Sequence, residues 1–381
     1  MSTPARPIAP IAPGEAVPWF VGRSLTNPHY HFNTVAGRHV VLFFPGSLGQ
    51  PLGAAVQRTL LARRALFDDV RCSLFVVTGD EGDVAAGRAQ DHLPGVRILV
   101  DPRFDVARQF GVAAQVDGRI TLQPALVLLD PTLRVMQWFL CTNEQPDPAP
   151  HLLDAVSLLP MPLAGPALPQ APVLVVPRVF EPAFCRTLID HYERVGGADS
   201  GYMRKDADGI RGVIDYSVKR RMDCVIEDEA LRRAIGARIS RRLKPEIARV
   251  FRFDATRMER YLVACYDAQT GGYFRPHRDN DGDGHRQFAV TLNLNTDDYE
   301  GGDLRFPEYG LQTYRAPTGG ACVFSCGLMH EATPVTQGRR YAFLPFLYDE
   351  ASAARREANN AQYVDPKHHY HRVELAEPGA T

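Results

Sequence analysis

Two histidines and one aspartate have the most specific chemistry in this sequence. His277 and Asp279 stand in the segment PHRD, and His330 follows far downstream in the segment LMHE. Alternate residues of an extended strand share a face, so the His-x-Asp spacing places an imidazole and a carboxylate on one side. Two imidazoles and one carboxylate bind Fe(II) and leave three adjacent coordination positions open. The sequence therefore predicts a metal site made by His277, Asp279 and His330.

An arginine ten residues after His330 could hold an anion beside this metal. Two of the open metal positions suit a bidentate 2-oxo acid, and the third suits O₂. Arg340 can form a bidentate ion pair with the distal carboxylate of that acid. A turn at Gln337–Gly338 is predicted to return the chain as a neighbouring strand. Strand alternation then turns Arg339 to the opposite face.

The elements around these residues read as short strands preceded by helices. Segments with strand alternation, broken by Gly, Asn, Asp and Pro, are ERYLVACY, QFAVTLNLN, GGDLRFPE, LQTYRAP, ACVFS and RRYAFLPFLY. This spacing predicts a small antiparallel jelly-roll. Upstream, residues 180–193 and 228–250 carry apolar residues at helical spacing. Pro245 predicts a break in the second helix near Leu243.

The N-terminal part alternates strands with helices. Buried strands are predicted at 39–44, 73–78, 96–101, 125–130 and 135–139, and helices at 52–67 and 104–110. Strands separated by helices predict an α/β unit with a mostly parallel sheet.

Composition bounds the domain organisation. We predict a disordered leader at 1–11, a first domain at 12–150, a Pro-rich linker at 151–175, a second domain at 176–350 and a C-terminal extension at 351–381. The net charge of −1 argues against nucleic-acid or anionic-membrane partners. The sequence has no apolar run of membrane-spanning length and no signal-peptide pattern. Seven scattered cysteines are typical of reduced thiols, so a cytoplasmic location is predicted.

Residues 257–350 resemble the 2-oxoglutarate- and Fe(II)-dependent oxygenases of the prolyl 4-hydroxylase branch. The matching segments are RYLVACYDAQTGGYFRPHRDN, RQFAVTLNLN, EGGDLRFPE, APTGGACVF and HEATPVTQGRRYAF. The resemblance implies that His277, Asp279 and His330 bind Fe(II) and that Arg340 binds the C5 carboxylate of 2-oxoglutarate.

The same resemblance places two further residues near the cofactor. It puts Tyr266 beside the cofactor, although a core aromatic residue is the other reading. Asn293 stands where many relatives carry Tyr, so Asn293 or another side chain would be the second cofactor anchor. Succinate and CO₂ would be the co-products and ascorbate an optional cofactor. The chemistry needs no catalytic acid–base pair from the protein.

Residues 12–140 resemble the peroxiredoxin branch of the thioredoxin fold. The resemblance rests on PGEAVPWF, GRHVVLFFPGSLG, ILVDPRFDVARQFGV and QPALVLLDPTLRV. It implies a cis peptide bond at Pro124 and a peroxidatic cysteine at the start of the helix after Phe-Phe-Pro. The segment Pro45–Gly53 contains no cysteine, and Cys72 reads as a core residue. A thiolate peroxidase cannot work without its thiolate, so this domain is predicted to be a redoxin scaffold without peroxidase chemistry.

The leading hypothesis is an iron oxygenase that hydroxylates an aliphatic C–H, with a peptidyl proline as the foremost substrate. A free amino acid or small metabolite is the alternative within this class. A non-catalytic module that senses iron or oxygen is the alternative from another class. Residues 201–215 read as a solvated loop or a substrate lid. The redoxin-like half could present substrate, mediate a homodimer or be a remnant.

Overall fold

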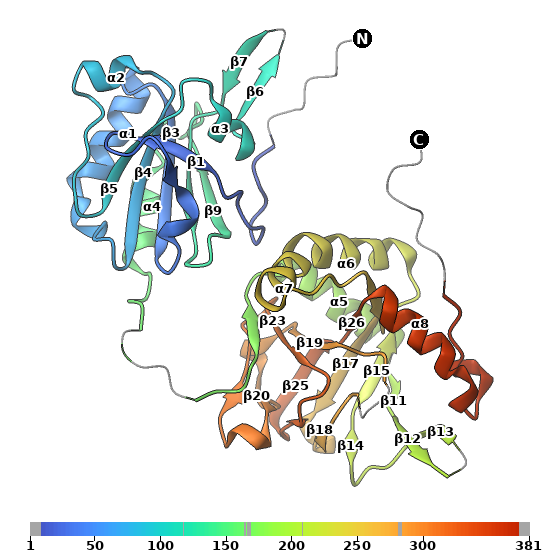
Figure 1. Cartoon of the computed structure of the whole chain (residues 1–381). Helices are drawn as coiled ribbons and strands as arrows, with labels where there is room; N and C mark the ends of the chain where they lie inside the picture. Colours follow the sequence, from blue (N-terminus) through green and yellow to red (C-terminus); the bar gives the residue numbers. More distant parts are fainter. Residues whose placement is uncertain are drawn as a thin grey trace. The chain divides into compact units, whose positions relative to one another are not determined.

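The chain forms two compact units, shown in the computed structural model of Figure 1. The structure describes residues 9–116, 118–163, 165, 169–207, 209–280 and 284–372. The first unit spans Met1–Pro166 and the second Ala167–Thr381. Most of the predicted leader lies outside the described residues. Ile11, at its end, is anchored, because its carbonyl accepts a 2.7 Å hydrogen bond from Trp138 Nε1.

The first unit is built on a seven-stranded sheet. In spatial order its strands are β2 (Tyr30–His31), β1 (Val21–Ser24), β5 (Val96–Val100), β4 (Cys72–Thr78), β3 (His39–Gly46), β8 (Ala125–Leu129) and β9 (Val135–Leu140). A hairpin of β6 (Ala113–Val116) and β7 (Arg119–Leu122) lies apart from it. Only the β3–β4 and β4–β5 pairs are parallel. The expectation of a mostly parallel sheet is therefore wrong, because a tight turn rather than a helix joins β8 to β9.

Helices cover this sheet, and the last of them occupies the start of the predicted linker. They are α1 (Pro51–Ala62), α2 (Gly82–Ala85), α3 (Asp105–Gln109) and α4 (Ala149–Ser157). Val56 and Leu60 of α1 pack with Leu152 and Val156 of α4 in one core cluster. Helix α4 takes the first part of the region predicted as linker, because its apolar residues are buried on the sheet. The Gln123–Pro124 bond is trans, and the cis bond found in the described chain is Leu93–Pro94.

The second unit has two facing sheets. The larger runs β10 (Leu174–Val176), β23 (Ala321–Ser325), β19 (Phe288–Asn293), β25 (Val335–Phe343), β17 (Leu262–Asp267), β15 (Met222–Val225) and β11 (Ala198–Asp199), with β16 (Arg257–Glu259), β20 (Tyr299–Gly301) and β26 (Phe346–Tyr348) paired at its sides. The smaller runs β14 (Lys219–Arg220), β18 (Tyr273–His277), β24 (His330–Ala332), β21 (Leu304–Arg305) and β22 (Thr313–Tyr314). All these pairs are antiparallel, and Ala264 of β17 packs with Ala332 of β24 between the sheets. The predicted jelly-roll is confirmed.

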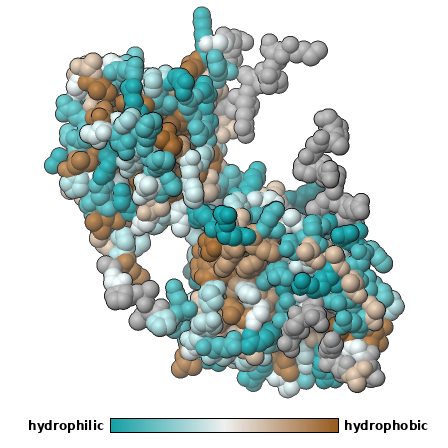
Figure 2. All heavy atoms as spheres, viewed as in Figure 1, coloured by the Kyte–Doolittle hydropathy of each residue, from teal (hydrophilic) through white to brown (hydrophobic). Residues whose placement is uncertain are grey.

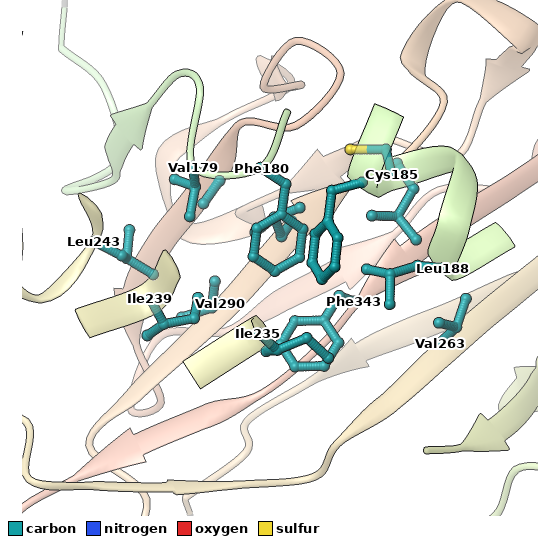
Figure 3. Close-up of a cluster of buried hydrophobic side chains, with 14 of the residues drawn as sticks. Val179, Phe180, Cys185, Leu188, Ile235, Ile239, Leu243, Val263, Val290 and Phe343 are labelled. Atoms are coloured by element: carbon teal, nitrogen blue, oxygen red, sulfur yellow. The ribbon is translucent and has the colours of Figure 1, made fainter. Parts of the chain in front are cut away.

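Helices cover the outer face of the larger sheet. They are α5 (Pro182–Val195), α6 (Glu229–Arg242) and α7 (Lys244–Phe251), and Figure 1 shows them together on one side. The predicted break is confirmed, since Pro245 lies in the first turn of α7. Figure 3 shows Phe180, Cys185 and Leu188 meeting Ile235 and Phe343 in a buried cluster. This packing fixes the larger sheet, whose inner face carries half of the site.

The C-terminal segment folds against the second unit over its described part. Helix α8 (Glu350–Ala358) buries Ala353, and Arg356 Nη1 lies 2.7 Å from Glu259 Oε2. Residues 373–381 lie outside the described part. Figure 2 shows hydrophilic side chains over much of the visible face of each unit, with apolar side chains between them. Within the described ranges, no helix is long and apolar enough to span a bilayer.

The junction between β3 and α1 lacks the thiol that peroxidase chemistry requires. Pro45–Gly53 contains no cysteine. Its Leu48 backbone N–H instead donates a 2.7 Å hydrogen bond to the buried carboxylate of Asp83. Cys72 lies fully buried in β4, and burial raises the pKa of its thiol to about 12.

We expect the purified protein to reduce hydrogen peroxide no faster than a denatured control. A pKa of about 12 leaves on the order of one Cys72 thiol in 100,000 ionised at pH 7, and the thiolate is the nucleophile. Peroxide consumption followed by loss of absorbance checks this. Rapid consumption that disappears in Cys72→Ser would contradict it.

Candidate functional site

Strand pairing brings the three predicted metal ligands together. His277 ends β18 and His330 begins β24, and the two residues are direct partners in the antiparallel register. Their imidazole centroids lie 4.3 Å apart. Asp279 follows β18, with its carboxylate 3.7 Å from His277 Nε2 and 3.3 Å from His330 Nε2. One potential ligand atom from each residue lies within 4.8 Å of the others, a spacing that suits one metal ion.

Backbone carbonyl groups orient both imidazoles. His277 Nδ1 lies 2.8 Å from the Arg275 carbonyl, and His330 Nδ1 lies 3.0 Å from the Leu328 carbonyl. A carbonyl oxygen can only accept, so both Nδ1 atoms carry the proton and donate it. Each Nε2 then presents a lone pair toward the shared centre. This carbonyl support is the usual outer-shell arrangement of metal-binding histidines.

Burial and charge also favour a ligand set of neutral imidazole and carboxylate. Burial lowers the pKa of His277, which keeps its ring neutral near pH 7. The pKa of Asp279 lies well below its ordinary value although burial would raise it, so its carboxylate is ionised. Phe274 stacks on His277 with centroids 3.5 Å apart and shields that ring from water. The triad therefore fits a divalent transition metal.

Arg340 is held in the same cavity by the opposite sheet. It lies on β25 directly across from Tyr266 of β17, and its guanidinium carbon is 4.9 Å from the Tyr266 ring centroid. The inner cavity beside the triad is lined by both residues together with Thr291, His277 and His330. Arg340 is only 2% exposed, yet its Nε and Nη1 have no hydrogen-bond partner among the described residues. Buried guanidinium N–H groups without acceptors are costly, and an anion in this cavity would supply the missing acceptors.

The alternation of Arg339 and Arg340 is confirmed. Arg339 is 49% exposed and its Nη1 pairs with Glu193 at 3.0 Å, away from the cavity. The expected turn is misplaced, because Gln337 and Gly338 lie inside β25. The chain turns instead between the end of β24 at Ala332 and the start of β25 at Val335. Strand β25 then joins the facing sheet rather than pairing with β24, so Arg340 looks across the cavity at the triad.

Asn293 does not line the inner cavity, although it was a predicted cofactor anchor. Its Nδ2 donates a 2.9 Å hydrogen bond to the Ala316 carbonyl. Thr291, two residues earlier on the same face of β19, lines the cavity in its place. Period-two alternation from Asn293 could have identified Thr291. Arg221, which also lines the cavity and donates to Tyr266 Oη at 3.4 Å, had no motif to mark it.

A wider outer cavity of about 810 Å³ opens beside the triad. The hairpin of β12 (Tyr202–Asp206) and β13 (Gly209–Val213) forms one wall of it. Residues 201–203 and 212–214 therefore form part of the wall of a cavity that also touches His277 and Asp279. His285 is buried, and its Nε2 lies 3.1 Å from Glu259 Oε2.

The solved structures similar to this chain include a prolyl-4-hydroxylase and a peroxiredoxin. A Pseudomonas putida prolyl-4-hydroxylase is 19% identical, with 47% of this chain and 94% of that chain covered and a TM-score of 0.37. Peroxiredoxin Q of Xanthomonas campestris is 16% identical, with 38% of this chain and 97% of that chain covered and a TM-score of 0.31.

Sequence comparison identifies the family of the second unit. A PKHD-type hydroxylase of Pseudomonas fluorescens is 36% identical over 91 residues, which are 21% of this chain and 39% of the relative. The chain thus spans about two fifths of the length of this curated relative. Residues 261–348, which include the triad and Arg340, match the model of the 2OG-Fe(II) oxygenase superfamily. The second unit therefore carries a domain of the 2OG-Fe(II) oxygenase superfamily, as its sequence predicts.

Proposed function

We propose that this protein is an Fe(II)- and 2-oxoglutarate-dependent dioxygenase that hydroxylates an aliphatic C–H of a prolyl residue in a peptide. Succinate and CO₂ are the co-products. The observation that carries the proposal is the buried, unpartnered Arg340 guanidinium facing the cavity of a two-histidine, one-carboxylate triad. That pairing offers a metal and a fixed cation to the two ends of one dicarboxylate.

Each residue has a defined part in this proposal. His277 and His330 bind iron through Nε2, and Asp279 binds it through its carboxylate. Arg340 binds the C5 carboxylate of 2-oxoglutarate, and Tyr266 and Thr291 contact the cofactor from the cavity wall. When bound, the iron and 2-oxoglutarate supply the O₂-dependent oxidation that converts C–H to C–OH. The protein contributes orientation and the exclusion of water through buried aromatic residues such as Phe324.

The outer cavity supports a peptide over a free amino acid. Its volume of about 810 Å³ reaches from the triad to the β12–β13 hairpin. This span exceeds what a single amino acid fills and accommodates residues on both sides of a target proline. Incubating candidate peptides with Fe(II), 2-oxoglutarate and O₂ and analysing them by mass spectrometry tests this assignment. An added oxygen on proline supports it, and oxidation of free amino acids alone contradicts it.

Three further expectations belong to the same proposal. They are ascorbate as an optional cofactor, a cytoplasmic location and a homodimer formed through the first unit. Added ascorbate should sustain turnover over repeated cycles by keeping the iron in the ferrous state.

Replacing either histidine of the triad should abolish 2-oxoglutarate turnover. His277→Ala and His330→Ala each remove one of three protein ligands. Loss of an outer-shell partner alone costs about 10- to 100-fold in metal affinity, so Fe(II) affinity should fall by more than about 100-fold. Anaerobic Fe(II) titration and succinate release measure the two effects. The matched control is His369→Ala, because His369 is an exposed histidine of the same unit. Full turnover by either triad variant would rule out this metal site.

Replacing Arg340 should weaken 2-oxoglutarate binding and leave Fe(II) affinity nearly intact. A charge-assisted hydrogen bond contributes roughly 1.5–3 kcal/mol, so Arg340→Ala should raise KM for 2-oxoglutarate on the order of 10- to 100-fold. The KM of Arg340→Lys for 2-oxoglutarate should lie between those of Arg340→Ala and the wild type, because an ammonium keeps the positive charge and loses the two parallel donors of the guanidinium.

Arg339→Ala is the matched control for this experiment, since its side chain lies on the opposite face. Its KM should match that of the wild type. A defect in Arg339→Ala with none in Arg340→Ala would show that the wrong arginine had been assigned to the cofactor.

A further inference from the structure

The outer cavity is lined by more basic than acidic side chains among the described residues. The basic ones are Lys219, Arg260, Arg278, Arg286 and Arg356, and the acidic ones are Glu259 and Asp279. Asp279 is committed to the metal in the proposed function, which leaves Glu259 as the other acid that lines this cavity. Arg278 has a separate partner, since its Nη2 lies 2.7 Å from Glu308.

Glu259 is shared by two guanidinium groups. Arg286 Nε lies 2.6 Å from one of its oxygens and Arg356 Nη1 lies 2.7 Å from the other. Burial would raise the pKa of Glu259, but the adjacent Arg286 and the other basic neighbours hold it well below its ordinary value. One carboxylate charge therefore faces two guanidinium charges at this wall of the cavity.

The carboxylate of Asp223 is likewise approached by two guanidinium groups, those of Arg221 and Arg260. Its Oδ2 accepts a 2.6 Å hydrogen bond from Arg221 Nη2, whereas Arg260 Nη2 reaches the same oxygen only at 3.5 Å. Burial and the nearby Arg221 lower the pKa of Arg260 to about 10 and that of Lys219 to about 6. Asp223 therefore pairs closely with Arg221, and Arg260 is the less tightly paired of the two guanidinium groups.

Arg260 lines both the inner and the outer cavity. Its backbone φ of 68° lies in the left-handed region, which a non-glycine residue adopts at a conformational cost. Its guanidinium lies 5.2 Å from the Phe346 ring centroid, and that of Arg286 lies 4.1 Å from the same centroid. Arg260 also lines the inner cavity with His277 and Asp279. Two like charges are therefore gathered at one aromatic ring beside the triad, where an anion would stabilise both.

From this arrangement we infer that the substrate carries a carboxylate close to the target carbon, and that Arg260, assisted by Arg286, binds it. The inference rests on the proposed function and narrows its substrate class. Met203, Val213 and Phe274 give the same cavity an apolar part, which would receive the uncharged ring that bears the target C–H. The carboxylate can come from an acidic residue next to the proline or from the α-carboxylate of a C-terminal proline.

A peptide series separates these sources. Acetylated, amidated peptides carry one proline flanked by glutamate, glutamine or lysine, and a further pair ends in proline as the free acid or the amide. Anaerobic binding with Fe(II) and 2-oxoglutarate, followed by aerobic kcat/KM, is measured for each peptide. We expect the glutamate peptide, the free-acid peptide or both to be preferred over their neutral counterparts on the order of 10- to 100-fold. A preference for the free acid alone would identify the α-carboxylate as the source.

Charge reversal at Arg260 tests whether this residue sets the preference for a carboxylate. The ratio of the glutamate to the lysine peptide within one variant does not depend on how much protein is folded. Arg260→Gln should reduce this ratio toward one, Arg260→Lys should restore part of it, and Arg260→Glu should favour the lysine peptide. If the free acid alone is preferred, the ratio of free acid to amide is followed instead and should fall in Arg260→Gln. Arg252→Gln is the matched control, because Arg252 is an exposed arginine of the same unit with a left-handed backbone.

The outcomes separate this inference from the proposed function. Equal binding of the charged and neutral peptides, no binding of any peptide, or an unchanged ratio in Arg260→Glu overturns the carboxylate assignment. If 2-oxoglutarate turnover persists in those cases, the dioxygenase function stands without it. Selective binding of acidic peptides by a wild-type protein that never forms succinate would instead remove the function and keep the charge preference.

Discussion

The pairing of β18 with β24 is the constraint on which the site depends. It sets His277 opposite His330, so a shift of one residue in this register would turn one imidazole to the other face of the sheet. The carbonyls of Arg275 and Leu328 fix both rings from the same two strand ends. Asp279 lies two residues beyond the end of β18, close enough for its carboxylate to approach both imidazoles. The three side chains of the candidate metal site are thus brought together by one strand pair and the residues beside it.

The facing sheet supplies the charge that this strand pair lacks. Arg340 and Tyr266 are partners on β25 and β17, and the helices behind that sheet hold it rigid through residues such as Phe343 and Val263. A buried guanidinium without an acidic partner is tolerated only where a ligand completes it or the surrounding fold offsets its cost. The positive charge at Arg260 follows the same principle. In both places, incomplete pairing inside the protein marks where a bound anion would contribute.

The sequence predicted those features that depend on local chemistry and alternation. The triad spacing, the opposite faces of Arg339 and Arg340, and the helix break at Pro245 all follow from periods of two or 3.6 residues and from proline geometry. Features set by distant parts of the chain were missed. The side-chain amide of Asn293 donates to the Ala316 carbonyl, so a tertiary contact decides where this side chain lies. The antiparallel pairing of β9 with β8 depended on the tight turn between them rather than on the composition of either strand.

The β3–α1 junction of the first unit, where the sequence resemblance implies a peroxidatic cysteine, lies beside a buried carboxylate. Asp83 is fully buried beside the β3–α1 junction, where it accepts hydrogen bonds from Leu48 N–H, the Thr78 hydroxyl and Arg88. Its carboxylate thus accepts from a backbone N–H of the Pro45–Gly53 segment. A cysteine introduced in this segment would lie near the carboxylate, and a nearby negative charge raises the pKa of a thiol. A reactive thiol at this junction would therefore require removal of Asp83 as well as an added cysteine, so the hydrogen bonds that stabilise the junction oppose thiolate chemistry there.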